Sequence, residues 1–314
     1  MDRDITEKRL ENCNDVFADI FDNLVFDGEH VLDEEQLVSL PTESFSRKIS
    51  GGVRQGNRDI RKMNGKNGAY RLICGLENQS GRDNTMPQRI MGYDFSAYEE
   101  QIKELMEENR KVGNPAYGKR IHDHQKLIPV VTAVLYYGTE GWEHPKCLHD
   151  MLEFPEDMKD SVKARVANYP MNLIHVAQLP KETRNRLKSD FRLIAEFCAC
   201  KGRREKIGKL MEENQQKILH PEEFFDTLSA VTGDKRYREV YVYMQEREKL
   251  EEGLKMCEFM DYMENKGMEK GIKALIQNCS EFQNPRAGVT EKLMQKFQLS
   301  RESAEEYMEK YWQK

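Results

Sequence analysis

Hydrophobic and polar positions along the chain predict an α/β arrangement that is followed by helices alone. Apolar residues recur at helical spacing over 14–25 and 87–111, which is typical of amphipathic helices. A second, short helix is expected over 33–39. Four other runs read as strands: 57–63, 70–79, 128–137 and 172–179. This order predicts an α/β fold with a mixed central sheet that is flanked by helices.

Beyond Pro180 every periodic segment is helical, including a long charged helix over about 235–270. The last segment holds two short helices, 290–297 and 300–312, joined by a tight turn. Such a pair resembles a helix-turn-helix, but it is not conspicuously basic, so docking or self-association is the favoured role. We therefore treat the C-terminal helices as a candidate homodimer surface. The expected domains are 1–205 (α/β), 206–270 (a helical extension) and 271–314 (a small helical unit).

Composition and cysteine usage narrow the class of protein. A length of 314 residues suggests about two domains and allows a sizeable core. The seven cysteines are scattered, odd in number and without a CxxC pair, so we expect reduced thiols in the cytoplasm. The longest apolar run, Leu127 to Tyr137, is far shorter than the ~20 residues that a membrane-spanning helix needs. The charged first residues contain no signal-peptide pattern.

Charge is distributed unevenly along the first quarter of the chain. Residues 1–44 carry 13 acidic against three basic side chains, whereas residues 45–75 carry eight basic side chains and Asp59 alone among acids. The net charge of −6 argues against tight nonspecific binding of nucleic acid, but this basic segment could face a phosphate backbone. A solvated charge run is the alternative explanation.

The strand over 70–79 places an acid and an amide side by side. Residues two apart share a face of a strand, so Glu77 and Gln79 lie on the same face as Gly75. The turn signal Asn-Gly-Lys-Asn-Gly at 64–68 predicts a hairpin with the preceding strand, whose open end would bring Asp59 to Glu77. Two carboxylates beside basic residues suit a hard cation such as Mg²⁺. A buried Glu77 that is satisfied by backbone groups or Arg71 is the alternative.

Other clusters of metal-ligating residues carry less weight. The pair His122 and His124 lies in a polar loop without thiols, and His144, Cys147 and His149 lack a second ligand pair. No GxxxxGK[ST] phosphate loop and no GxSxG elbow is present, which weighs against an NTPase and a serine hydrolase.

Three motifs together resemble a known family. Arg58-Asp59-Ile60 is followed by Gly75-Leu76-Glu77-Asn78-Gln79 and then by Met86-Pro87-Gln88-Arg89, which continues to Tyr93-Asp94. Over residues ~14–200 this pattern resembles the recombination-promoting nuclease / putative transposase family of the PD-(D/E)XK nuclease superfamily. The resemblance implies a restriction-endonuclease-like core and a bacterial, cytoplasmic protein.

The resemblance also implies roles for individual residues. Asp59 corresponds to the metal-binding Asp, and Glu77 to the acid of the E-x-K signature. Gln79 stands where many superfamily members have Lys. An N-terminal helix often adds an acid and a Lys, but Asn14 and Ala18 occupy those positions here, so Asp15 or Asp19 would have to substitute.

On this basis we expect a Mg²⁺-dependent DNA endonuclease, with Mn²⁺ as a second usable metal. Asp59, Glu77 and the Asn78 carbonyl would hold the metal, and Gln79 would orient the attacking water. Four basic residues are candidate contacts to the DNA backbone: Arg58, Arg61, Lys62 and Arg89. The alternative is a catalytically weak or inactive nuclease fold that serves as a DNA-binding or protein-interaction module.

Overall fold

The computed structural model divides the chain into two compact units. It describes residues 10–47, 53–57, 59–65, 71–200, 217–245, 254–282 and 284–312. The first unit contains the N-terminal 207 residues together with Leu219–Arg238, and the second contains Gly208–Ile218 and Glu239–Lys314. Within the described part of the chain, no helix is both long enough and apolar enough to cross a membrane.

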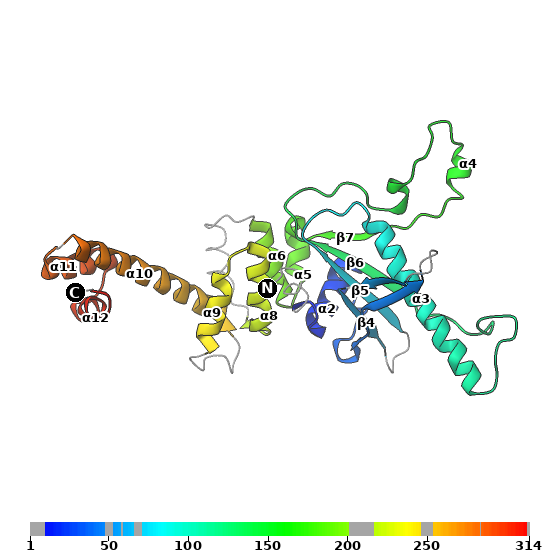
Figure 1. Cartoon of the computed structure of the whole chain (residues 1–314), viewed down its shortest axis with the longest axis horizontal. Helices are drawn as coiled ribbons and strands as arrows, with labels where there is room; N and C mark the ends of the chain where they lie inside the picture. Colours follow the sequence, from blue (N-terminus) through cyan, green and yellow to red (C-terminus); the bar gives the residue numbers. More distant parts are fainter. Residues whose placement is uncertain are drawn as a thin grey trace. The chain divides into compact units, whose positions relative to one another are not determined.

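A five-stranded mixed sheet forms the centre of the first unit (Figure 1). Its spatial order is β1 (Val38–Ser39), β4 (Ile60–Asn64), β5 (Leu72–Gln79), β6 (Val130–Tyr136) and β7 (Asn172–His175). The pairs β1–β4 and β4–β5 are antiparallel, whereas the pairs β5–β6 and β6–β7 are parallel. The expected α/β fold with a mixed sheet flanked by helices is therefore confirmed.

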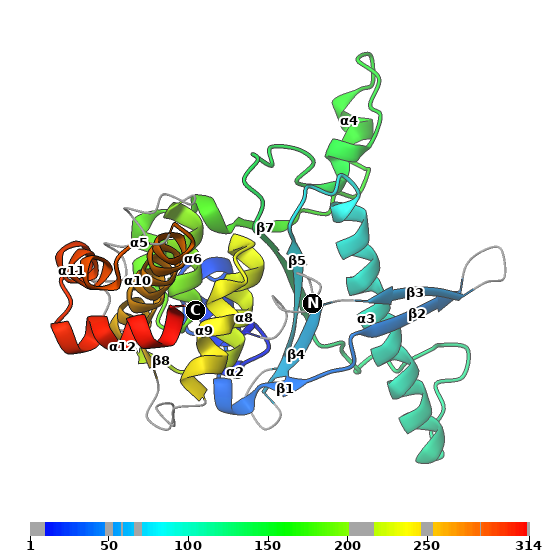
Figure 2. The same ribbon diagram turned by 60° about the vertical axis from the view of Figure 1, so that its left-hand side comes forward.

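Helices cover both faces of this sheet, as Figure 2 shows. Helix α3 (Met86–Lys111) lies across one face, where Met86 and Ile90 pack against Val134 and Tyr136 of β6. The other face carries the N-terminal helix and two later helices: α2 (Asn14–Ile20), α6 (Phe191–Cys200) and α8 (Pro221–Thr232). Their aromatic side chains are fully buried, which places the main core between these helices and the sheet.

Most predicted elements are confirmed, and the departures have physical reasons. The first helix continues as a π-helical turn, Phe21–Val25. Within 33–39 only a 3-10 turn, Glu34–Gln36, is helical, because Val38–Ser39 pairs with β4 and forms the edge strand β1. The strand predicted over 172–179 ends at His175, where the 3-10 turn Val176–Gln178 begins.

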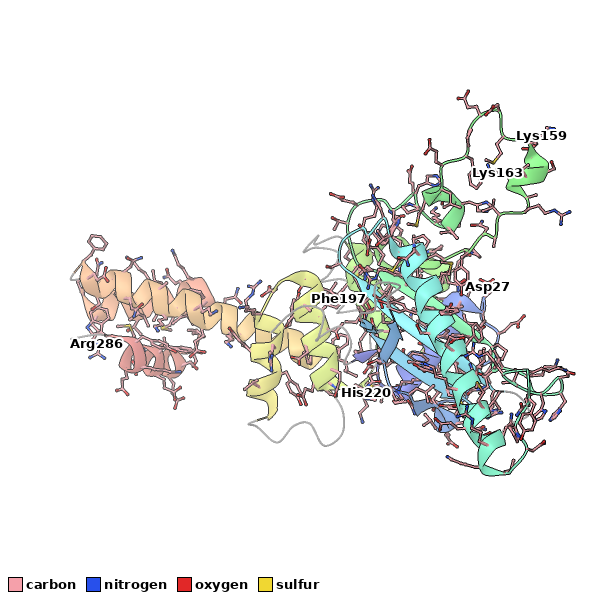
Figure 3. All side chains as sticks on the ribbon, turned by 45° about the vertical axis from the view of Figure 1, so that its right-hand side comes forward. Asp27, Lys159, Lys163, Phe197, His220 and Arg286 are labelled. Atoms are coloured by element: carbon pink, nitrogen blue, oxygen red, sulfur yellow. The ribbon has the colours of Figure 1, made fainter. Side chains whose placement is uncertain are left out.

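Two segments of the first unit project from its central sheet. A hairpin of β2 (Glu43–Arg47) and β3 (Val53–Asn57) precedes β4 and reaches α3. Between β6 and β7 the chain forms an arm with the 3-10 turn Leu148–Met151 and the one-turn helix α4 (Asp160–Lys163). Figure 3 shows Lys159 and Lys163 on this arm, away from the sheet. Helix α5 (Lys181–Arg186) then leads into α6.

The second unit is built on helix α10 (Met256–Glu281), which packs against α11 (Arg286–Phe297) and α12 (Arg301–Tyr311). Its core includes Ile272, Ile276 and Leu293. The prediction of one continuous helix over 235–270 is wrong. Helix α9 (Arg236–Gln245) is separate from α10, because Leu254–Lys255 forms strand β9 with β8 (Lys217–Ile218). The predicted homodimer through these helices stays a prediction.

Candidate active site

Asp59 and Glu77 face each other at the open end of the β4–β5 hairpin. Ile60 pairs with Leu76 in the antiparallel register, so the next position outward brings Asp59 opposite Glu77. The alternation of side chains puts both residues, together with Gln79, on the face of the sheet that α3 covers. The hairpin and the shared face are therefore confirmed, and the two carboxylates that the sequence singled out are neighbours.

The carboxylate of Asp59 is fixed by the backbone of β5. The N–H of Asn78 donates a hydrogen bond of 2.7 Å to Asp59 Oδ2. The N–H and C=O of one residue in a strand point toward the same neighbouring strand, so the main-chain carbonyl of Asn78 is also directed toward Asp59. The next carbonyl, that of Gln79, accepts from Tyr137 on the opposite side of the strand. Two carboxylates and one carbonyl thus converge at this strand end.

Glu77 is almost completely buried, at 1% exposure, and is ion-paired with Arg89 of α3. The guanidinium also contacts Asp83 at 2.8 Å and the Tyr93 hydroxyl at 3.0 Å. The Gln79 amide donates a long hydrogen bond of 3.4 Å to the same Glu77 oxygen. The Arg89 guanidinium and the Gln79 amide therefore contact the same carboxylate oxygen of Glu77.

Burial and mutual contacts shift the pKa values of three ionisable groups around Glu77. Burial raises the pKa of the Tyr93 hydroxyl, and the nearby charge of Glu77 raises it further. Burial alone would raise the pKa of Asp83, but hydrogen bonds from Thr85 and Arg89 outweigh it and lower that pKa. Burial opposes the charge of Arg89, yet the contacts with Asp83 and Glu77 raise the pKa of the guanidinium overall. Arg89 is therefore a permanent cation at this site.

The donor set fits a hard divalent cation. Mg²⁺ favours carboxylate and carbonyl oxygens and usually keeps several waters, and Asp59, Glu77 and the main-chain carbonyl of Asn78 supply such oxygens. The side chain of Asn78 projects to the other face, so its amide oxygen is not shared with Glu77. Among the described residues, no group of three or more His, Cys, Asp or Glu side chains is arranged to hold a metal. Metal binding here would thus depend on two acids.

The basic residues expected to contact DNA have different surroundings. Arg61 is on the α3 face but is buried and paired with Glu100 at 2.6 Å. Lys62 points to the opposite face, is 1% exposed, and donates to the Asn12 carbonyl and to Asn14. Arg58 lies outside the described residues. In this conformation Arg61 and Lys62 offer no exposed cation to a phosphate, whereas Arg89 is 29% exposed.

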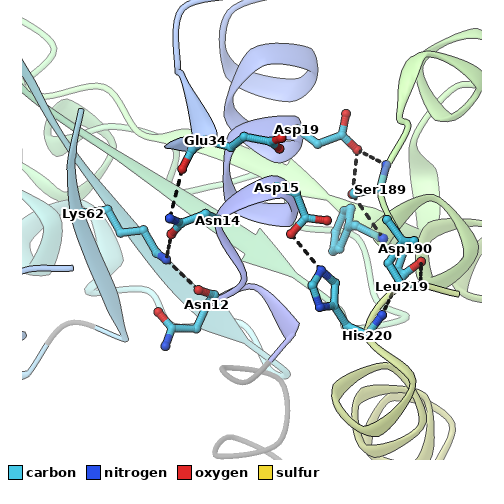
Figure 4. Close-up of polar contacts among 11 residues, drawn as sticks. Asn12, Asn14, Asp15, Asp19, Glu34, Lys62, Ser189, Asp190, Leu219 and His220 are labelled. Atoms are coloured by element: carbon cyan, nitrogen blue, oxygen red, sulfur yellow. Dashed lines mark hydrogen bonds and ion pairs between the residues drawn. The ribbon is translucent and has the colours of Figure 1, made fainter. Parts of the chain in front are cut away.

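The two acids considered for the N-terminal helix serve other contacts, which Figure 4 shows. Asp19 accepts hydrogen bonds from the backbone N–H groups of Lys188 and Ser189 and from the Ser189 hydroxyl. Asp15 is paired with His220 at 2.8 Å. Both carboxylates are therefore directed toward the helices after β7, on the face of the sheet opposite to Glu77.

Sequence reasoning missed one buried acid and two groups around Arg89. Glu11 is fully buried and binds the Asn78 side chain and the Tyr137 hydroxyl, beneath the strand that carries Glu77. No sequence signal marks this contact across 67 residues. Tyr93 could have been found, because it lies four residues after Arg89 and such residues are neighbours on a helix. Asp83 lies in the loop just before α3.

Comparisons with known proteins give one match. A family model described as "Putative transposase, YhgA-like" matches residues 30–212, which is more than half of the chain. The matched segment contains the whole β4–β5 hairpin and α3. No curated protein matches the chain, and no solved structure matches it.

Proposed function

Because the chain belongs to the YhgA-like transposase family, we propose that it is a metal-dependent DNA endonuclease that hydrolyses phosphodiester bonds. Mg²⁺ is the proposed metal, and Mn²⁺ is the proposed substitute. The family supports a role related to transposition or nucleic-acid cleavage, and the cleavage chemistry is proposed from the residues at the strand end.

The observation that carries this proposal is the pair of carboxylates at the open end of the hairpin. Asp59 immediately precedes β4, and Glu77 lies in β5. The two residues lie opposite each other, one position beyond the Ile60–Leu76 pair, and share a face of the sheet. The backbone N–H of Asn78 holds the Asp59 carboxylate in place. Two neighbouring carboxylates repel each other unless positive charge is nearby. Arg89 supplies one positive charge to Glu77, and a bound divalent cation would add positive charge between the two acids.

Each residue has a distinct part in the proposed reaction. Asp59, Glu77 and the Asn78 carbonyl would hold the metal, which would lower the pKa of a water and offset charge on the phosphoryl group. The Gln79 amide lies beside Glu77 and can hydrogen-bond the attacking water. The side chains of Asp59 and Glu77 thereby fix where hydrolysis takes place, at the end of β5 beside the start of α3.

A second candidate function is a DNA-binding or protein-interaction module without catalysis. The observation that favours it is the ion pair between Arg89 and Glu77, because a guanidinium on that carboxylate competes with a metal. Neutral Gln79 also supplies no ammonium at the position next to Glu77. Cleavage assays separate the two functions.

The test is nicking of supercoiled plasmid in Mg²⁺, in Mn²⁺ and in EDTA by the full chain. We expect nicking that requires metal and that falls at least about 100-fold in Glu77→Gln and in Asp59→Asn. Both substitutions keep the size of the side chain and remove its charge. Circular dichroism of each variant establishes that it is folded.

The matched control is Glu99→Gln. Glu99 is also an acid of the first unit paired with an arginine, Arg120, but it lies on the exposed side of α3. This variant should cut like the wild type. Equal cutting by Glu77→Gln would contradict the assignment of the site, and a folded wild type that cuts no plasmid, linear duplex or single strand in either metal would favour the non-catalytic module.

A further inference from the structure

Arg89 is held in one orientation by three neighbours. Its guanidinium lies between the carboxylates of Glu77 and Asp83 and also donates to the Tyr93 hydroxyl. The carbon of the guanidinium is 5.9 Å from the centre of the Tyr93 ring. Because Arg89 and Tyr93 are four residues apart on α3, the helix itself keeps this pair together.

Three acids lie at the strand end, and a phosphodiester would bring further negative charge to it. Asp59, Glu77 and Asp83 lie there, and attack by water adds further negative charge to the phosphoryl oxygens. Gln79 is neutral and cannot compensate it. Arg61 is on the same face, but Glu100 already pairs with it and it is 8% exposed. Lys62 points to the other face.

Arg89 retains capacity for a ligand. A guanidinium has five N–H groups in a fork that matches phosphate geometry. Among the described residues, the contacts with Glu77, Asp83 and Tyr93 occupy three of them. The side chain is 29% exposed, so a phosphate oxygen can reach the remaining N–H groups without unfolding of α3.

We propose that Arg89 is a catalytic residue that supplies from α3 the positive charge which Gln79 does not supply from β5. This inference rests on the proposed function. In the free protein Arg89 balances the charge of Glu77, and in the complex with DNA it contacts the phosphoryl oxygens beside the same carboxylate. Asp83 and Tyr93 are positioning residues, since they act through the guanidinium.

This assignment makes positions 79 and 89 interchangeable as sources of charge. Both side chains contact the same oxygen of Glu77, one from the strand and one from the helix. A lysine at position 79 would lie on the same face as Glu77. The substitution Gln79→Lys should therefore rescue a protein in which Arg89 is neutral.

The experiment compares four full-length proteins in the plasmid assay: the wild type, Arg89→Met, Gln79→Lys and the double variant. We expect Arg89→Met to lose at least about 100-fold in nicking rate, as for other removed electrostatic contacts. The double variant should recover at least about ten-fold of that loss. Arg120→Met, which neutralises an exposed arginine paired with α3, should cut like the wild type.

Metal binding gives a readout that a merely structural role would not produce. Arg89 competes with a cation for Glu77, so Arg89→Met should bind Mg²⁺ at least as tightly as the wild type in isothermal titration calorimetry, although it cuts far more slowly. A variant that had lost the shape of the site would bind Mg²⁺ more weakly. If Arg89→Met does not fold, Arg89→Lys keeps the charge but lacks the guanidinium fork, so it should fold, bind Mg²⁺ and cut about ten-fold more slowly than the wild type.

The outcomes separate this inference from the proposed function. A wild type that cuts, with Arg89→Met cutting within three-fold of it, overturns the role of Arg89 alone. Failure of the folded double variant to exceed Arg89→Met also overturns it. A folded wild type that never cuts overturns both the endonuclease and the role of Arg89.

Discussion

The backbone N–H of Asn78 and the carboxylate of Asp59 are joined by a hydrogen bond of 2.7 Å across the end of the β4–β5 hairpin. Asp59 lies one residue before β4, so this bond extends the pairing of the two strands beyond their last ladder pair, Ile60 with Leu76. The same contact fixes the position of one proposed metal ligand. The fold and the site are thus coupled at this residue.

We expect Asp59→Ala to lower the free energy of unfolding of the first unit by about 1–3 kcal/mol, because a hydrogen bond to a charged acceptor is lost. Asp59→Asn should lose less, since its amide oxygen can still accept. Urea unfolding followed by Trp142 fluorescence, in a Trp312→Phe background, reports on the first unit alone. Equal midpoints for Asp59→Ala and the parent would contradict the contact.

Asp19 connects α2 to the segment before α6 through three hydrogen-bond donors. These are the backbone N–H groups of Lys188 and Ser189, at 2.9 and 2.8 Å, and the Ser189 hydroxyl at 2.6 Å. Asp19→Ala would leave these donors unsatisfied at a site that is mostly buried. Each buried donor left without a partner costs about 1–3 kcal/mol.

We therefore expect Asp19→Ala to destabilise the first unit by about 2–4 kcal/mol in the same unfolding assay. Glu29→Ala, which removes an exposed acid just beyond α2, is the control and should change stability by less than about 0.5 kcal/mol. If both variants unfolded alike, the role of Asp19 in connecting α2 to the segment before α6 would be refuted. Loss of metal binding without loss of stability would instead restore Asp19 as a candidate ligand.

Local patterns in the sequence were sufficient to predict the hairpin and the face that carries Glu77. Strand alternation and the Asn-Gly turn are local rules, and they place Asp59, Glu77 and Gln79 together without knowledge of any distant contact. The α3 helix was predicted for the same reason, because its apolar stripe and its proline near the start are encoded within the helix.

Contacts between distant segments could not be predicted from these patterns. Asp19 accepts a hydrogen bond from Ser189, which is 170 positions away in the sequence, and Lys62 donates one to Asn14, which is 48 positions away. A run of basic residues says nothing about which of them will be buried, because alternate residues of a strand project to opposite faces. Lys62 is thus buried beneath α2, while Arg89, twelve residues from Glu77, completes the ion pair.

We expect the titration of Lys62 to make the free energy of unfolding of the first unit depend on pH in the alkaline range. Burial lowers the pKa of its ammonium below the usual 10.5, although the nearby carboxylate of Asp15 favours the charged form. Between the lowered pKa and 10.5 the unfolded chain binds more protons than the folded chain, so stability rises with pH in this window. Cys13, whose pKa burial raises to about 12, stays protonated there.

The comparison is between the wild type and Lys62→Met, unfolded in urea at about pH 7 and about pH 9.5. The free energy of unfolding of the wild type minus that of the variant should increase with pH, because only the wild type contains the titrating ammonium. Cys13 stays protonated in both folded proteins over this pH range, because burial raises the pKa of its thiol and loss of the lysine would raise it further. A difference that is constant or that falls with pH would show that the lysine is not desolvated.

Gly138, just after β6, has no room for a side chain because the Tyr136 ring occupies the space where a Cβ would stand. That ring is 1% exposed and is held edge-on by Trp142, with ring centres 5.0 Å apart, so it cannot move outward cheaply. We expect Gly138→Ala to cost about 1–3 kcal/mol through overpacking and to alter Trp142 fluorescence. Gly141→Ala is the matched control, since nothing lies within 4 Å of its added methyl group. Stability equal to that of the control would mean that the Tyr136 ring can adopt another position, and that this end of β6 is less rigidly packed than its burial indicates.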